Sequence, residues 1–191
     1  MKYDEYTKRI DKELGLLSQE EKVVLCLICC ARLFPLYEVF SEKEDWGDAS
    51  ILAESQSFAK KWLRRERLET KSLVKSLGSV IPDMDDFGSC LGSYALNAGL
   101  AHEHLLEQME SNDSAPAFYA LLSCYDTIDF YVQELLDPDS KGGVQDIDIE
   151  IHAMMSNETK WQFNIFSEIK NSKVLEKFAD NYETHAIINL A

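Results

Sequence analysis

A capped and uniformly apolar segment near the N-terminus constrains the fold most. Ser18 and Glu21 have the spacing of a capping box, in which each side chain bonds the backbone N–H of the other residue, so a helix should begin there. From Val23 to Phe34 the residues are apolar on every side of that helix, apart from Arg32. A helix without a polar face must be surrounded by other elements. We therefore expect residues 19–34 to form the central helix of the fold.

The rest of the chain shows mainly helical periodicity, with apolar residues recurring at intervals of three and four. Further helices are expected over residues 49–65, 68–77, 93–109, 115–136, 146–152, 157–169 and 172–182. Residues 146–152 also alternate as a half-buried strand does, but a lone strand would have no partner. With 46% hydrophobic residues the chain buries a full core. The sequence predicts an all-α, single-domain helical bundle over residues 1–191, with about seven to eight helices around the apolar central helix.

Charge favours a basic protein partner. The chain has 19 lysines and arginines against 34 aspartates and glutamates, a net charge of −15, which repels nucleic acid and anionic lipid. Residues 76–140 contain no lysine or arginine, whereas basic residues gather between Lys60 and Lys75. The leading hypothesis is a non-enzymatic protein-binding module that neutralises a basic partner, as immunity proteins do. A homodimer in which residues 60–75 dock on residues 76–140 of the mate is an alternative, and nucleic-acid binding is disfavoured.

The basic residues between Lys60 and Lys75 do not form one continuous stripe. If residues 51–77 were a single helix, Glu66, Glu69 and Thr70 would face the core. Polar and charged groups are costly there, so we expect a break in the helix.

The N-terminal region indicates a cytoplasmic protein. Asp4, Glu5 and Asp11 occupy the region where an export signal needs its apolar core. The apolar stretch Val23–Leu36 is interrupted by Arg32 and is shorter than the roughly 20 residues needed to span a bilayer, so no membrane association is expected. The five cysteines are expected to be reduced thiols, and those at 26, 29 and 30 to be small buried hydrophobic residues.

Arg32 requires a partner because burial of an unpaired guanidinium on an apolar helix is costly. The candidates are Asp48, Asp85 and Asp86, so a structural ion pair would hold the acidic loop around residues 83–86 on the core. Binding of an anion by Arg32 is the alternative.

A second candidate site joins His102 and Asp129. Asp129 falls within the apolar stripe of helix 115–136 and needs a donor, which His102 could supply. The pair is either a structural hydrogen bond or, with the acidic loop, part of a metal site in a metal-binding protein or a metal-dependent enzyme. Glu107-x-x-Glu110 followed by Asp126-x-x-Asp129 also resembles the paired acidic motifs that hold magnesium in helical pyrophosphatases, but the expected outward direction of the first pair argues against this interpretation. No catalytic residue and no cofactor are predicted, a divalent metal remains possible, and whether the chain is an enzyme stays open.

Two stretches carry a family resemblance. The first is Ala31–Tyr37, with Phe40, Trp46-Gly47-Asp48 and Trp62 following, and the second is Ile81–Gly88, followed by Ala95–Ala98. In order and spacing they resemble the YjaG-like bacterial proteins, the family of domain of unknown function 416. That resemblance implies an all-helical fold and a bacterial origin. The family usually has an acidic residue where this chain has Asn97, and it has no established activity from which catalytic residues could be transferred.

Overall fold

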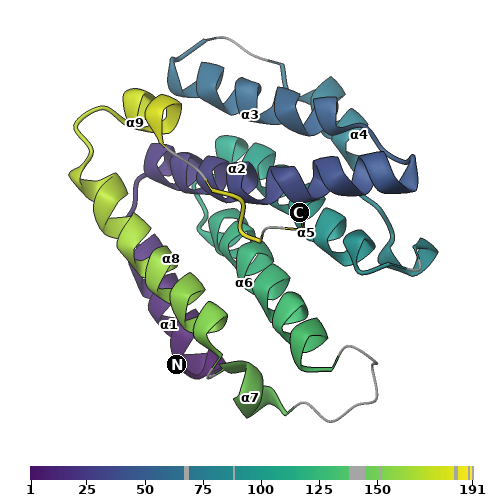
Figure 1. Ribbon diagram of the computed structural model, residues 1–191. Coiled ribbons are helices and arrows are strands. Elements are labelled where there is room, and N and C mark those ends of the chain that lie inside the picture. The colour runs from purple at the N-terminus through teal and green to yellow at the C-terminus, as the bar shows by residue number, and fades with distance from the viewer. Residues whose placement is uncertain are drawn as a thin grey trace.

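The protein is a single all-α domain in the computed structural model, which describes residues 1–66, 69–87, 89–137, 145–150, 152–182, 185–188 and 190. This part of the chain contains no strand (Figure 1). Its helices are α1 (Tyr3–Leu14), α2 (Gln19–Glu44), α3 (Ala49–Leu63), α4 (Lys71–Gly78), the 3-10 helix η1 (Met84–Asp86), α5 (Leu91–Glu110), α6 (Ala115–Leu136), α7 (Asp146–Glu150), α8 (Ala153–Asn171) and α9 (Leu175–Asn181).

The predicted central helix is confirmed as α2, which contacts α3, α5, α6, α8 and α9. Its capping box forms, because Ser18 Oγ accepts from the Glu21 N–H at 3.2 Å and Glu21 Oε2 accepts from the Ser18 N–H at 2.7 Å. The helix does not end near Pro35, as the sequence analysis expected, but continues to Glu44. Proline lacks one backbone donor, but burial of Tyr37 and Phe40 in the following turns offsets that loss.

Length and composition alone would let α2 cross a membrane, the one such helix found among the described residues. Of its apolar window, 72% is buried inside the protein by the surrounding helices. That degree of burial is what the core helix of a bundle shows.

Helix α1 was not predicted. The described part of the chain has nine α-helices, eight of them with seven residues or more, which agrees with the expected number of about seven to eight. The buried residues Tyr6, Ile10 and Leu14 of α1 recur every four positions, so one face of α1 packs on α6 and α8. This spacing, with charged residues between the apolar positions, is typical of an amphipathic helix, so the sequence did contain a signal for α1.

Two groups of helices cover α2, α5 and α6. Figure 1 shows α3 and α4 above α2 and α5, while α1 and α8 lie beside α6. The expected break in the basic region is confirmed, since α3 ends at Leu63 and α4 begins at Lys71; the predicted start of that second helix, at residue 68, lies outside the described residues. The strand-like segment forms the short helix α7, as predicted from its lack of a partner strand.

Candidate functional site

Arg32 is paired with Glu158 of α8, so the predicted partners Asp48, Asp85 and Asp86 are wrong. Its Nη1 and Nη2 donate to the two carboxylate oxygens of Glu158 at 2.9 and 2.7 Å, and the side chains are only 11% and 2% exposed. The guanidinium carbon also lies 3.5 Å from the centre of the Trp161 ring. A bidentate ion pair under an aromatic ring satisfies the buried charge, which makes Arg32 a structural residue that joins α2 to α8.

The three aspartates that were predicted to pair with Arg32 have other roles or lie exposed in the structure. Asp48 caps the start of α3, accepting from the Ser50 N–H at 2.9 Å. Asp85 and Asp86 are exposed in η1. The acidic loop is held on the core by the adjacent Phe87 instead.

The Phe87 ring packs edge-on against Phe40 and Trp46, with ring centres 4.8 and 5.5 Å apart. Tyr37 adds a hydrogen bond of 2.5 Å to the carbonyl of Val80, just before the loop. The motif residues of this region therefore serve packing.

His102 and Asp129 are not brought together. His102 is fully buried, with Nδ1 2.7 Å from the Ala98 carbonyl and Nε2 3.1 Å from the Gln56 amide nitrogen. Burial lowers the pKa of His102 to about 4, so the ring is neutral at pH 7. Asp129 instead accepts from the Gln133 amide at 2.5 Å, one turn further along α6. The predicted bond between His102 and Asp129 is wrong because the ring faces α3, whereas Asp129 faces α1 and α7.

The described residues contain no group of three histidine, cysteine, aspartate or glutamate side chains placed to hold a metal ion. The cysteines at 26, 29, 30 and 124 are fully buried, and burial raises the pKa of Cys26, Cys30 and Cys124. A thiol with a raised pKa is a poor nucleophile and a poor metal ligand, in agreement with the predicted role of Cys26, Cys29 and Cys30 as small core residues.

Asp129 does line a hollow, whose surface is mainly polar. We call it the acidic hollow; its volume is about 390 Å³. It is lined by Tyr3 of α1, Tyr125, Asp126, Asp129 and Gln133 of α6, and Asp146, Ile149 and Glu150 of α7. Helical spacing produces this arrangement, because residues three or four apart on α6 and on α7 share a face.

Two carboxylates of the acidic hollow, Asp126 and Asp129, have raised pKa values. Burial, followed by repulsion from Asp129, raises the pKa of Asp126 to about 6. Burial likewise raises the pKa of Asp129, against the lowering effect of the Gln133 hydrogen bond, and Asp146 raises it further. No lysine or arginine in the described part of the chain forms an ion pair with Asp126, Asp129, Asp146 or Glu150. The hollow therefore holds negative charge without an internal counter-ion from these residues.

Tyrosine rings form the wall of the acidic hollow and connect it to the core. The Tyr3 and Tyr125 rings lie 5.7 Å apart, and Tyr125 stacks on Tyr6 at 4.6 Å. The Tyr6 hydroxyl donates to Gln162 Oε1 at 2.6 Å, and the Gln162 amide donates to Glu158 at 2.9 Å. Tyr125 therefore rests on a ring, Tyr6, that hydrogen bonds connect to the Arg32 ion pair.

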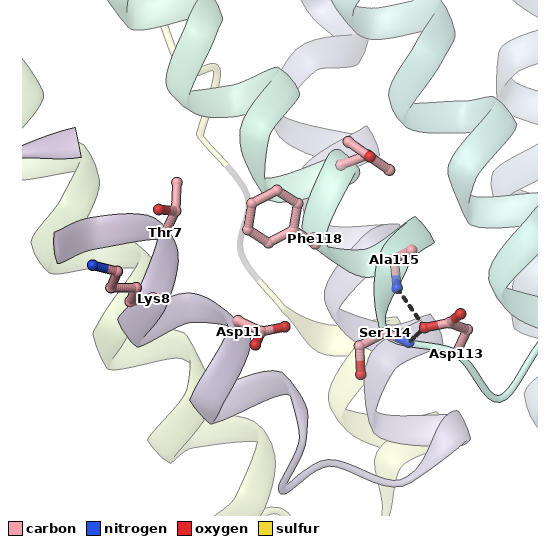
Figure 2. A pocket seen from close by; sticks show the side chains of 8 residues that line it. Thr7, Lys8, Asp11, Asp113, Ser114, Ala115 and Phe118 are labelled. Carbon is pink, nitrogen blue, oxygen red and sulfur yellow. Dashed lines mark hydrogen bonds between the residues drawn. The ribbon is translucent and has the colours of Figure 1, made fainter. Parts of the chain in front are cut away.

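A second hollow of about 390 Å³ lies between α1 and the start of α6. Figure 2 shows Thr7 and Asp11 on one side and Phe118 on the other, while Lys8 extends away from the Phe118 ring. Asp113 Oδ1 already accepts from the N–H groups of residues 114 and 115, at 2.6 and 3.2 Å. Because this carboxylate occupies the helix start, an anion is not favoured there.

Sequence reasoning found part of the acidic hollow. It singled out Asp129 and noted the pair Asp126-x-x-Asp129, but it assigned no role to Asp146 or Glu150. Asp146 and Glu150 are four residues apart in a segment predicted to be a short helix, so the sequence could have placed both on one face of that helix. That this face meets α6 follows from tertiary packing alone.

A family model described as "Protein of unknown function (DUF416)" matches residues 9–185. Among solved structures, the chain is similar to a DUF416 family protein from Shewanella baltica, at 20% sequence identity and a TM-score of 0.77. The similarity covers 88% of this chain and 90% of that chain, and at this identity it shows the fold alone. None of the curated proteins matches the chain.

Proposed function

The chain belongs to the DUF416 family of proteins of unknown function, as its motifs predicted, and from the acidic hollow we propose that it is a non-enzymatic protein-binding module. Its partner is a basic protein that inserts an arginine or lysine side chain into the hollow. The observation that carries this proposal is the group of carboxylates at 126, 129, 146 and 150, which line one concave site with tyrosines and without a cation from the described residues.

Burial and, to a smaller extent, repulsion from Asp129 raise the pKa of Asp126, and an inserted cation would offset both effects by stabilising the ionised carboxylate. A guanidinium group has several donors in one plane, so it bridges carboxylates that are separated by the width of a hollow. The exposed ring of Tyr3 and the neighbouring ring of Tyr125 add an attractive surface for a cation. The acidic hollow thus favours an arginine over a lysine.

A divalent metal is a weaker candidate for the same hollow. Magnesium and calcium require several oxygen ligands within about 2.0–2.6 Å of one point. The described residues have no such convergence of three ligating side chains. An extended organic cation needs no such convergence, and this difference favours the protein-binding hypothesis over the metal-dependent alternative.

Calorimetric titration with a tetra-arginine peptide tests the proposal. We expect saturable binding that weakens with salt and falls about tenfold or more in the double variant Asp126→Asn/Asp129→Asn. The matched control Asp11→Asn/Asp85→Asn removes the same charge from exposed positions outside the acidic hollow and should bind as the wild type does. Equal losses in both variants would mean unspecific attraction and would refute the proposal.

The same calorimetric series, repeated with magnesium and calcium chloride, tests the metal alternative. Saturable metal binding that is lost in Asp126→Asn/Asp129→Asn, without binding of the peptide, would replace the proposed function by a metal site. A pull-down from cell lysate at low and high salt then identifies the natural partner. A stoichiometric basic protein that is lost at high salt is the expected result, because ion pairs at a rim are screened.

A further inference from the structure

A second surface, distant from the acidic hollow, lies along the contact of α4 with α5. We call it the α4–α5 seam. Leu77 and Leu106 form its floor and are 1% and 2% exposed, whereas Val74 at its edge is 46% exposed. Together with glutamates of α5 they enclose a mainly apolar hollow of about 280 Å³. Figure 1 places α4 at the opposite end of the molecule from α7, so this seam is separate from the acidic hollow.

The two edges of the α4–α5 seam carry opposite charges. Glu103, Glu107 and Glu110 line it from α5 and form its glutamate edge. On α4, spacing of about 100° per residue places Lys71 and Lys75 beyond Val74 on the outer side, and both are exposed. They form its lysine edge.

The charges on the two edges are not satisfied by one another. Neither lysine forms an ion pair within the described part of the chain. On the other edge, Glu107 lies 2.9 Å from Nδ1 of His104, its neighbour on α5, and Glu110 accepts from Thr70 Oγ1 at 3.1 Å; neither glutamate pairs with a lysine or an arginine in the described part of the chain. An apolar strip with charges of opposite sign on its two sides is complementary to itself.

We propose that the α4–α5 seam binds a second copy of this chain and forms a homodimer. In an isologous interface each surface meets its own copy after a half-turn. A twofold axis parallel to the seam places the lysine edge of each copy over the glutamate edge of the other, with the Val74 side chains between them. An axis across the seam would instead oppose like charges, so the charge pattern selects one arrangement.

The net charge of −15 does not prevent this contact at physiological ionic strength. Repulsion between distant charges is screened beyond about 8 Å at 0.15 M salt, whereas ion pairs across a desolvated seam are screened much less. The dimer is therefore favoured by salt concentrations that screen the rest of the surface. It leaves the acidic hollow free, so each copy binds its basic partner independently.

Sedimentation equilibrium of the whole chain measures the dimer directly. The wild type should sediment with twice the 21.8 kDa mass of one chain, and Val74→Glu should sediment as the monomer. Val174→Glu is the matched control, because Val174 is 45% exposed and lies at the start of α9, away from the seam. It should remain a dimer. A monomeric wild type, or a dimer that persists in Val74→Glu, would overturn the proposal.

Charge reversal tests the proposed arrangement independently of the apolar strip. The variants Lys71→Glu/Lys75→Glu and Glu103→Lys/Glu107→Lys should each be monomeric, because like charges would face each other. An equimolar mixture of the two should form a heterodimer, since every reversed lysine then meets a reversed glutamate. Circular dichroism confirms that each variant is folded. Failure of two folded variants to associate on mixing would refute the twofold arrangement.

Discussion

Replacement of Asp126 by asparagine should stabilise the folded protein at pH 7 while it weakens binding of a basic ligand. Burial and the neighbouring Asp129 raise the pKa of this carboxyl from 3.8 to about 6, so the ionised group is less favourable in the folded state than in the unfolded chain. Asparagine retains the shape of the side chain and removes the charge. Binding-site residues often lower the stability of the folded protein, so that their replacement raises stability and weakens function.

The magnitude follows from the pKa shift. A shift from 3.8 to about 6 corresponds to roughly 3 kcal/mol for a fully buried group. Asp126 is only partly buried, so solvent screening reduces this, and we expect a gain of about 1 kcal/mol for Asp126→Asn. In a domain of this size that gain raises the midpoint of thermal unfolding by about 2–4 °C.

The pH dependence has a definite sign. Between pH 3.8 and about 6 the folded protein binds more protons at Asp126 than the unfolded chain does, so stability from this group falls as pH rises through that window. The advantage of Asp126→Asn should therefore be absent below pH 4 and complete above about pH 6. Urea unfolding at a series of pH values measures it, with Asp11→Asn as the control for net charge. An equal gain in both variants, or a gain that does not vary with pH, would refute the reasoning.

Three further predictions concern residues of the core: Arg32, Gly47 and His102. Arg32→Ala should lower the free energy of unfolding by about 3–5 kcal/mol in urea titrations, because Glu158 keeps a buried charge without a partner, whereas Arg32→Met/Glu158→Met should cost less. Gly47→Ala should cost about 1–3 kcal/mol, since residue 47 has a φ of 77° and a Cβ there would collide with the Tyr37 hydroxyl; an unchanged unfolding midpoint would contradict this. The His102 ring should give NMR shifts that stay constant from pH 8 to about 5 and titrate only near pH 4, and titration near pH 6.5 would show that the ring is not buried as described.

Local features of the fold were predictable because their causes are local. The capping box at Ser18 depends on residues within one turn, and the structure confirms it. The boundary at Pro35 was wrong because burial of side chains in the next turns outweighs one missing hydrogen bond. Tertiary packing overrides a local signal at that position.

The partner of Arg32 was not predictable by the same reasoning. Glu158 lies 126 residues further along the chain, and no local feature distinguishes it from the other aspartates and glutamates, 34 in all. The prediction that a charge on an apolar helix needs a partner was correct. The aspartates proposed as partners belong to the same sequence motifs as Arg32, but they do not lie next to it in the structure. Only the crossing of α2 and α8 decides which carboxylate is reached.

The Arg32 ion pair also explains how a polar site can sit on such an apolar bundle. Glu158 accepts from Gln162, and Gln162 accepts from the Tyr6 hydroxyl behind Tyr125, so the wall of the acidic hollow is positioned from the core. Tyr125 is only 6% exposed and stacks on Tyr6, so its ring is supported from the core beside the carboxylates Asp126 and Asp129. The buried ion pair thus helps to fix one side of the acidic hollow before a ligand binds, which is what a preorganised site requires.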